Sequence, residues 1–256
     1  MAMIFDSHAH YDDEAFDTDR AELLASLPTQ GIGAVINAAT DPVSAEQCLR
    51  MAATYPHIYA AVGIHPEAVD RATDDWLTHI AHLAREQKAV AIGEIGLDYH
   101  YDDAAPREIQ RQWFRRQLAL AGEMNLPVIV HDRDAHEDVL TLLRESRPRG
   151  VVHCFSGSVE MMREVVALGM YIGLGGATTF KNAKRPAAVA AAVPVDCLLL
   201  ETDAPYMAPE PCRGHRCDST LIRYTAARIA ELRGMSIEEL LEVTYANAEK
   251  LFLQKG

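Results

Sequence analysis

The sequence lacks several features that would assign it to a special class of protein. No apolar run approaches the roughly 20 residues of a bilayer-spanning helix, so we expect no membrane partner. The opening MAMIFDSHAH has neither a basic segment nor a long apolar stretch, so we expect no signal peptide. Linkers rich in glycine or serine and internal repeats are also missing. With 49% hydrophobic and 24% charged residues, the composition is that of a globular protein and excludes a disordered chain.

Cysteine is sparse. The five residues are scattered over the chain: Cys48, Cys154, Cys197, Cys212 and Cys217. An odd, scattered set in a chain long enough to bury a large core is typical of reduced thiols, not of a disulfide framework. We therefore expect a cytoplasmic protein.

Basic residues are also in deficit. The chain has 24 Lys and Arg against 37 Asp and Glu, which gives a net charge of −13. This balance argues against a protein that coats nucleic acid through general electrostatics. An enzyme stays compatible with it, because bound metal ions can make an active site locally positive.

Short apolar runs bounded by turn residues divide the chain. There are eight: Ile4–Phe5, Ala34–Ala38, Tyr59–Ile64, Ala89–Ile95, Pro127–Val130, Val151–Cys154, Met170–Leu174 and Cys197–Leu200. Most are continuous rather than alternating, which is typical of parallel strands buried on both faces. The segments between them are long enough for the crossover helix that each parallel pair requires. Two further helices are predicted over Thr220–Arg233 and Ser236–Leu253.

This pattern predicts an α/β fold, a (β/α)8 TIM barrel, as a single domain over residues 1–256. A doubly wound open sheet is the alternative, because the order of strands cannot be read from one sequence. The only long irregular connection is Ala204–Ser219, which is rich in proline and cysteine. Long loops without regular structure are usually functional.

Histidine and acidic residues stand where most of the predicted strands end. The first strand runs into His8 and His10, whose side chains point the same way in an extended chain. Later strands end in the same manner, at His65, Glu94, His131, His153, and Glu201 with Asp203. Burying such groups costs several kcal/mol unless they are paired or bind metal. Because barrel active sites assemble at the carboxyl ends of the strands, we expect one shared site there.

The types of these residues favour a metal centre. Imidazoles with carboxylates suit Zn, Mn and related ions, and they tolerate Mg where substrate oxygens complete the shell. Four imidazoles and two carboxylates from this set exceed the needs of one tetrahedral ion, so we expect two divalent ions (Mg, Mn or Zn) with a bridging carboxylate. Cys154 follows His153, and we expect it to point the other way along its strand as a buried thiol.

These residues resemble the TatD-type metal-dependent hydrolases of the amidohydrolase-like barrel superfamily. Each matching block alone is a weak signal, but the ordered set spans nearly the whole chain and is specific. The blocks are Asp6-Ser7-His8-Ala9-His10, Gly63-Ile64-His65-Pro66, Gly93-Glu94-Ile95-Gly96-Leu97-Asp98, His131-Asp132-Arg133-Asp134-Ala135, His153-Cys154-Phe155-Ser156-Gly157, Glu201-Thr202-Asp203-Ala204-Pro205-Tyr206, and Asn247-Ala248 with Phe252.

The resemblance implies a ligand set. One metal ion would be held by four residues: His8, His10, Glu94 and Asp203. Glu94 would bridge to a second ion, whose other ligands match His131 and His153. Asp203 also matches the catalytic residue that orients or deprotonates the attacking water.

The resemblance also implies contacts around the metals. His65 and Arg133 match positions that face the substrate phosphate in the family. Glu201 is expected to lie behind the ligands and to hold a ligand histidine in its tautomer.

The irregular loop departs from the family pattern. Arg213-Gly214-His215-Arg216 is followed by Cys217-Asp218-Ser219, where relatives have basic residues and an Asn-Glu-Pro segment. Arg213 and Arg216 keep the positive charge, and Arg213 is our candidate substrate contact in this loop. Cys212, His215 and Cys217 would give a third metal site fewer than the usual four ligands, so we expect two free thiols.

The resemblance implies a metal-dependent hydrolase acting on ester bonds, specifically a 3′–5′ deoxyribonuclease that uses a metal-activated water. Nucleic acid, DNA first of all, is then the expected substrate. Lys181, Lys184 and Arg185 after the seventh strand favour a phosphate substrate.

Two alternatives stay open. The first is a metal-dependent amide or ester hydrolase, such as a deacylase of misacylated tRNA, because fold does not fix substrate. The second is a non-catalytic scaffold that binds metal without turnover. The sequence leaves the native metal, the choice between DNA and RNA, and the oligomeric state open, a monomer included.

Overall fold

A computed structural model provides the structure, which describes residues 2–254. Met1, Lys255 and Gly256, which belong to the expected domain of residues 1–256, lie outside the described residues. Eight parallel strands form one sheet whose spatial order follows the chain. The strands are β1 (Ile4–Ala9), β2 (Ile32–Ala38), β3 (Ile58–Val62), β4 (Ala89–Asp98), β5 (Val128–Arg133), β6 (Gly150–Val152), β7 (Tyr171–Leu174) and β8 (Leu198–Leu200).

The first and last strands come together and nearly close the sheet into a barrel. Ser7 Oγ on β1 donates a hydrogen bond to the carbonyl of Leu200 on β8 at 3.0 Å. The backbone N–H of His10 donates to the carbonyl of Ala204 at 2.6 Å. The predicted (β/α)8 TIM barrel is therefore confirmed, and each of the eight apolar runs overlaps a strand. The doubly wound alternative is wrong, because its strand order would have to reverse within the sheet.

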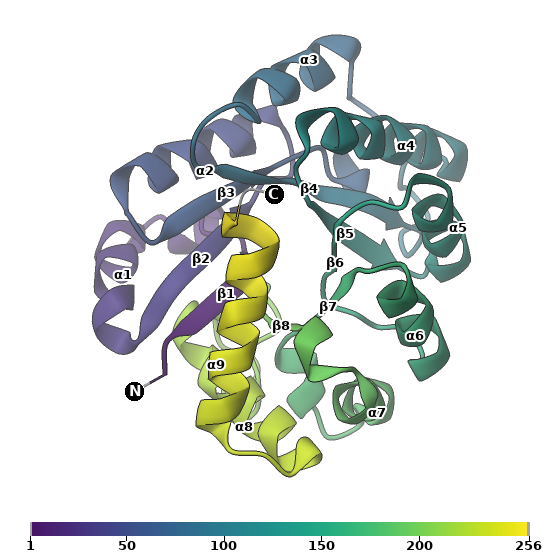
Figure 1. Cartoon of the computed structure of the whole chain (residues 1–256). Coiled ribbons are helices and arrows are strands. Elements are labelled where there is room, and N and C mark those ends of the chain that lie inside the picture. Colours follow the sequence, from purple (N-terminus) through teal and green to yellow (C-terminus); the bar gives the residue numbers. More distant parts are fainter. Residues whose placement is uncertain (1, 255–256) are drawn as a thin grey trace.

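Helices surround the strands (Figure 1). They are α1 (Arg20–Ser26), α2 (Pro42–Thr54), α3 (Asp74–Leu83), α4 (Arg107–Met124), α5 (His136–Ser146), α6 (Val159–Ala167), α7 (Lys184–Ala192), α8 (Ile222–Arg233) and α9 (Ile237–Ala248). Local sequence fixes several of their ends. Asp41 caps α2 by accepting the N–H groups of Val43 and Ser44, each at 2.9 Å. Ser236 and Glu239 form a capping box that begins α9.

The last two helices lie close to their predicted ranges. Gly234 ends α8 in the left-handed region at φ 65°, as a glycine after a helix commonly does. The predicted helix Ser236–Leu253 divides in two, because α9 ends at Ala248 and a π-helical turn covers Glu249–Leu253.

The barrel interior is filled mainly by small and branched apolar side chains, among them Ala34, Ala38, Ala61 and Ile129. Aromatic rings close it at the end where the strands begin. The rings of Phe5 and Tyr245 meet edge to face at 5.5 Å, and those of Phe5 and Phe252 stack at 6.4 Å. Figure 1 shows α9, in yellow, lying across this part of the barrel. The opposite end, where the strands stop, presents polar groups from several strands.

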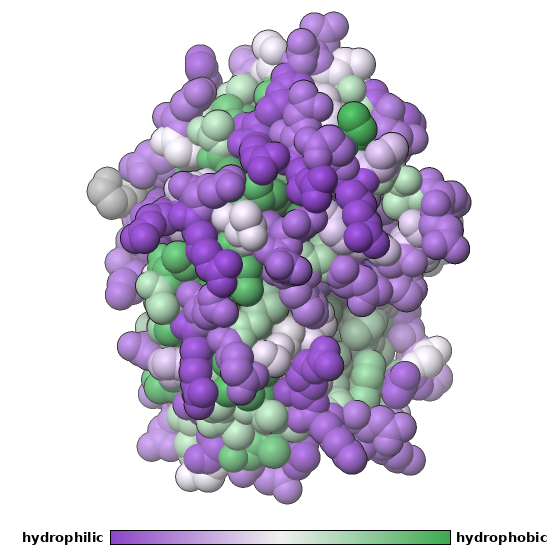
Figure 2. All heavy atoms as spheres, turned by 90° about the vertical axis from the view of Figure 1, so that its right-hand side faces the viewer, coloured by the Kyte–Doolittle hydropathy of each residue, from purple (hydrophilic) through white to green (hydrophobic). Residues whose placement is uncertain are grey.

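One face of the outer surface is largely polar (Figure 2). Figure 2 shows hydrophilic side chains over most of the face that forms the right-hand side of Figure 1, with smaller hydrophobic areas between them. Within residues 2–254, none of the helices combines the length and the apolar character needed to cross a membrane.

Candidate metal centre

Two histidines at the end of β1 point toward the same place. The Nε2 atoms of His8 and His10 are 3.0 Å apart. His10 Nδ1 donates to the carbonyl of Ala38 at 2.8 Å, so its Nε2 is left to face the site. Asp203 Oδ1 lies 3.7 Å from His8 Nε2 and 3.5 Å from His10 Nε2.

The backbone places Asp203 beside these histidines although it follows a different strand. Asp203 has a left-handed φ of 63°. Its N–H donates to the carbonyl of His8 at 3.0 Å, so the end of β1 holds the loop after β8 directly. Its side chain is 19% exposed against 3% for Glu94, so Asp203 can reach solvent.

Glu94 lies at the middle of the cluster. Its Oε2 is 3.2 Å from His8 Nε2 and 3.4 Å from His10 Nε2. Its Oε1 is 2.7 Å from both His131 Nδ1 and His153 Nε2. The two oxygens of one carboxylate thus face different pairs of imidazoles, which is the placement that a bridging ligand needs.

His65 lies inside this cluster. Its Nε2 is 3.6 Å from Glu94 Oε1, and its ring meets that of His131 at 4.5 Å. In the described part of the chain, three groups bring metal-ligating atoms within 4.8 Å of one another: His8 with Glu94 and His153, His8 with His10 and Asp203, and His65 with Glu94 and His131. The substrate contact expected of His65 therefore lies within reach of the metal ligands.

The electrostatics follow from packing one carboxylate among imidazoles. Burial alone would raise the pKa of Glu94, but His153 and His8 hold it well below its usual range. Burial would lower the pKa of His131, yet its hydrogen bonds to Asp98 and Glu94 raise it to about 10. Burial and the neighbouring His153 lower the pKa of His8 to about 4. The pKa values of neighbouring groups in this cluster are therefore shifted in different directions.

The donor set fits divalent metal ions. Neutral imidazole nitrogens and ionised carboxylates are the ligands that zinc and manganese prefer. The Nε2 atoms of His8 and His10 lie 3.0 Å apart, and both face the carboxylates of Glu94 and Asp203. A cation would bind between these converging groups. The buried Nδ1 atoms of His8 and His153 have no hydrogen-bond partner, so the hydrogen bonds within the site do not satisfy these rings.

Glu201 lies behind His153. Its Oε1 is 3.8 Å from His153 Nδ1, and burial raises its pKa to about 8. Gly173 on β7 leaves the room, since a Cβ there would be 2.3 Å from Glu201 Oε2. The N–H of Cys154 donates to Glu201 Oε1.

The expectation that Cys154 is a buried thiol pointing the other way along its strand was wrong. Strand β6 ends at Val152, and Cys154 is half-buried at a left-handed φ of 41°.

The expected substrate-binding arginines lie on different elements, Arg133 on a strand and Arg213 on the irregular loop. Arg133 ends β5, where its guanidinium packs 4.9 Å from the ring centre of Tyr101 and its Nη1 donates to Tyr101 Oη at 3.0 Å. Arg213 is exposed and stacks over Phe180 at 4.0 Å. The structure brings neither guanidinium into the metal cluster.

The remaining expectations concern the rim and the irregular loop. Lys181, Lys184 and Arg185 are all exposed in the connection after β7 and the first turn of α7. Cys212 and Cys217 are free thiols, and the metal-ligating groups found in residues 2–254 include neither.

One residue of the site had no role in the sequence analysis. Asp98, at the end of β4, is 1% exposed and its Oδ2 lies 2.9 Å from His131 Nε2. Its place on the strand of Glu94, four residues further on, was a signal that went unused. The contact itself depends on how β4 and β5 align, which the sequence does not display.

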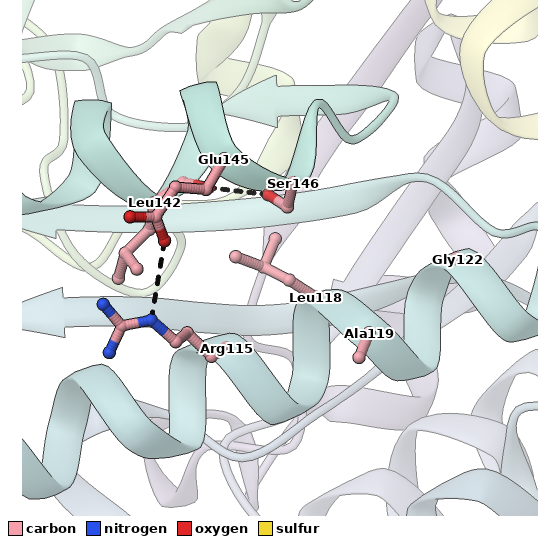
Figure 3. Close-up of a pocket in the computed structure, with 7 residues that line it drawn as sticks. All are labelled: Arg115, Leu118, Ala119, Gly122, Leu142, Glu145 and Ser146. Carbon is pink, nitrogen blue, oxygen red and sulfur yellow. Dashed lines mark hydrogen bonds and ion pairs between the residues drawn. The ribbon is translucent and has the colours of Figure 1, made fainter.

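A hollow of about 380 Å³ lies elsewhere, between α4 and α5. Figure 3 shows its lining residues: Arg115, Leu118, Ala119, Gly122, Leu142, Glu145 and Ser146. Arg115 and Glu145 form an ion pair at 3.6 Å across it. Pockets are the usual first guess for a site, but this one shares no residue with the clusters found in the described chain.

The barrel and its cluster together define a metal-dependent hydrolase. The family model for TatD related DNase matches residues 5–253. The uncharacterized metal-dependent hydrolase YabD of Bacillus subtilis is 43% identical, with 98% of this chain and 99% of that protein covered. A 3′–5′ ssDNA/RNA exonuclease TatD of Cronobacter sakazakii is 34% identical, with 99% of each covered.

Solved structures agree. The crystal structure of YjjV, a TatD homologue from Escherichia coli, superposes with a TM-score of 0.92 at 34% identity and 98% coverage of both chains. This chain belongs to the TatD family.

Proposed function

We propose that the protein hydrolyses phosphodiester bonds, and that its substrate is DNA shortened from the 3′ end. The observation that carries the proposal is the position of Glu94 between two imidazole groups, each 2.7–3.4 Å from one of its carboxylate oxygens. Two divalent ions held there would activate water and neutralise the charge that builds on phosphate oxygens during in-line displacement. The names of two relatives, both 3′–5′ ssDNA/RNA exonucleases, support this choice of substrate.

The chain's own residues divide the work. His8, His10 and Asp203 would hold one ion, His131 and His153 would hold the second, and Glu94 would be shared. Asp203 is also the base, because its carboxylate is the more exposed of the two that face the β1 histidines. Burial would raise the pKa of Asp203, but the neighbouring His10, His153 and His8 keep the pKa lowered, so the carboxylate is ionised.

The basic side chains at and around the metal cluster would bind the substrate phosphate. His65 is close enough to the ligands to meet a phosphate oxygen beside the second ion. Arg133 and Arg213 supply positive charge further out, each stacked on an aromatic ring that limits its motion. All five cysteines are free, which is consistent with the reducing cytoplasm in which we place the enzyme.

A cleavage assay on 5′-labelled single-stranded DNA with added Mg²⁺ or Mn²⁺ tests the proposal. We expect a ladder that shortens from the 3′ end and disappears with EDTA. Asp203→Asn should remove turnover by about 10²- to 10⁴-fold while the fold stays intact. Full activity in that variant would contradict the assigned base. Intact DNA in the presence of protein with bound metal would contradict the substrate and favour a carbonyl compound.

A further inference from the structure

Both ring nitrogens of His131 face a carboxylate, and only one of them faces the metal cluster. Nδ1 lies 2.7 Å from Glu94 Oε1 and 3.5 Å from His153 Nε2, so this is the atom that would bind the second ion. Nε2 points the other way, to Asp98 Oδ2 at 2.9 Å. A metal ion on Nδ1 would leave Nε2 to carry the ring proton and to donate it to Asp98.

Asp98 is itself held from several sides. Its Oδ1 accepts the N–H of His100 at 2.9 Å. Gln110 on α4 pairs with its backbone in both directions: Asp98 N donates to Gln110 Oε1 at 2.8 Å, and Gln110 Nε2 donates to the carbonyl of Asp98 at 2.8 Å. Gln110 and Asp98 are each 1% exposed, so a buried amide on the outer helical layer fixes the position of the carboxylate.

The strand geometry brings Asp98 this close. At Gly96 the backbone has φ 150°, and a Cβ there would lie 2.0 Å from the carbonyl oxygen of His131. Glycine therefore lets β4 approach β5 directly beside the ligand. The register then sets Asp98 opposite Arg133, two residues beyond His131.

We propose that Asp98 is a positioning residue for the second ion: it fixes the His131 ring so that Nδ1 is the ligand atom, and it strengthens that ligand. A carboxylate hydrogen-bonded to the far nitrogen of an imidazole makes the near nitrogen a better donor, and losing such a partner typically costs 10- to 100-fold in metal affinity. The other ligands have weaker support, a backbone carbonyl for His10 and a carboxylate 3.8 Å away for His153. The inference rests on the proposed two-ion centre and is independent of the substrate.

The chain offers a matched control. Asp132 Oδ2 accepts from His136 Nδ1 at 2.9 Å, the same distance as in the Asp98 pair, but His136 belongs to none of the ligand groups found in residues 2–254. Asp132→Asn and Asp98→Asn thus remove the same charge from two buried carboxylates paired with histidine. Of these two carboxylates, that of Asp98 contacts the ring of a proposed ligand, His131, and that of Asp132 contacts His136.

The test is a calorimetric titration of EDTA-dialysed protein with Zn²⁺, repeated with Co²⁺ while the visible absorption of the bound ion is recorded. Wild type and Asp132→Asn should bind two ions. Asp98→Asn should keep the first affinity, weaken the second by about 10- to 100-fold, and change the Co²⁺ spectrum only at the second equivalent. Should Asp98→Asn fail to fold, Gln110→Met, which frees the Asp98 backbone, should weaken the same ion by a smaller factor.

The outcomes separate the proposals. Two ions bound by Asp98→Asn with wild-type affinities and spectra would overturn the role of Asp98 alone. Equal weakening of both ions would overturn it as well, because it would mark a general structural defect. A single ion bound by wild type would overturn the two-ion centre, and the inference with it.

Discussion

The two ends of the barrel are built from the same strands but carry opposite chemistry. Where the strands begin, Phe5 packs against Tyr245 and Phe252, and the interior is apolar. Where they stop, Glu94 lies among imidazoles from several strands. The first end stabilises the fold by burying apolar surface. The second buries charged groups, and the cost of burying them is offset by pairing or by metal binding.

The comparison teaches that stability and function are separable in this molecule. We call the end where the strands begin, covered by aromatic rings, the closed end, and the end where they stop the open end. Substitutions at the closed end should lower the free energy of unfolding and leave metal binding unchanged. Substitutions at the open end should remove the ions and leave the fold in place. The predictions below test this division.

The largest effect is expected from Glu94→Gln at the open end. The amide lacks the charge that both ions share, so we expect loss of both and a fall in turnover of about 10³-fold or more. Metal analysis of purified protein, together with the DNA cleavage assay, measures this. Glu67→Gln, at an exposed carboxylate two residues after His65, is the control and should behave as wild type. A Glu94→Gln protein that retains two ions would contradict the division.

The counterpart at the closed end is Phe252→Ala. Removing this buried ring, which is 6% exposed, should lower the free energy of unfolding by about 3–5 kcal/mol because a cavity is left behind. Urea unfolding monitored by circular dichroism measures the change. Metal content per folded molecule should match that of wild type, and a selective loss of metal would count against the separation.

Two glycines allow a matched comparison. A Cβ on Gly173 would push Glu201 away from its place behind His153, so Gly173→Ala should weaken one ion by about 10-fold. A Cβ on Gly33 would lie 2.8 Å from Tyr245 Oη, so Gly33→Ala should lower the free energy of unfolding by about 1–3 kcal/mol. Zn²⁺ titration and urea unfolding of both variants give the result. Identical profiles for the two variants would break the comparison.

The smallest effect is expected from His136→Gln. Asp132 raises the pKa of His136 by accepting its hydrogen bond, so folding favours the protonated ring. This contribution is complete below the ordinary histidine pKa of about 6.5 and is lost as pH rises through the higher pKa of the folded state. Because the ring is one-third exposed, the loss should be about 0.5 kcal/mol at pH 6 and less at pH 9. Unfolding curves of both proteins at the two pH values test the sign, and a larger loss at pH 9 would reverse it.

Much of the fold could be predicted because the strands are continuous apolar runs. The limits of that signal are visible in β1, which was predicted over Ile4–Phe5 and extends to Ala9. The added residues include Asp6, fully buried and bonded to Thr202 and Ser219 at 2.7 Å each. Partners some 200 residues away in the sequence satisfy this carboxylate, and no local pattern reveals them.

The candidate site divides in the same way. The spacing of His8 and His10 predicts that they point together, because alternation along a strand is local geometry. The contact between Asp98 and His131 required the alignment of two strands beside Gly96 and the clamp from Gln110 on another layer. Residue types and positions could therefore be read from the sequence, but the hydrogen bonds that orient them could not.

The most direct test of the central claim is a crystal of the protein grown with Mn²⁺ or Zn²⁺ and measured at the absorption edge of that metal. We predict two anomalous peaks on either side of the Glu94 carboxylate, about 3.5–4 Å apart, one beside His8 and His10 and the other beside His131 and His153. A single peak, or peaks that lie away from Glu94, would contradict the account.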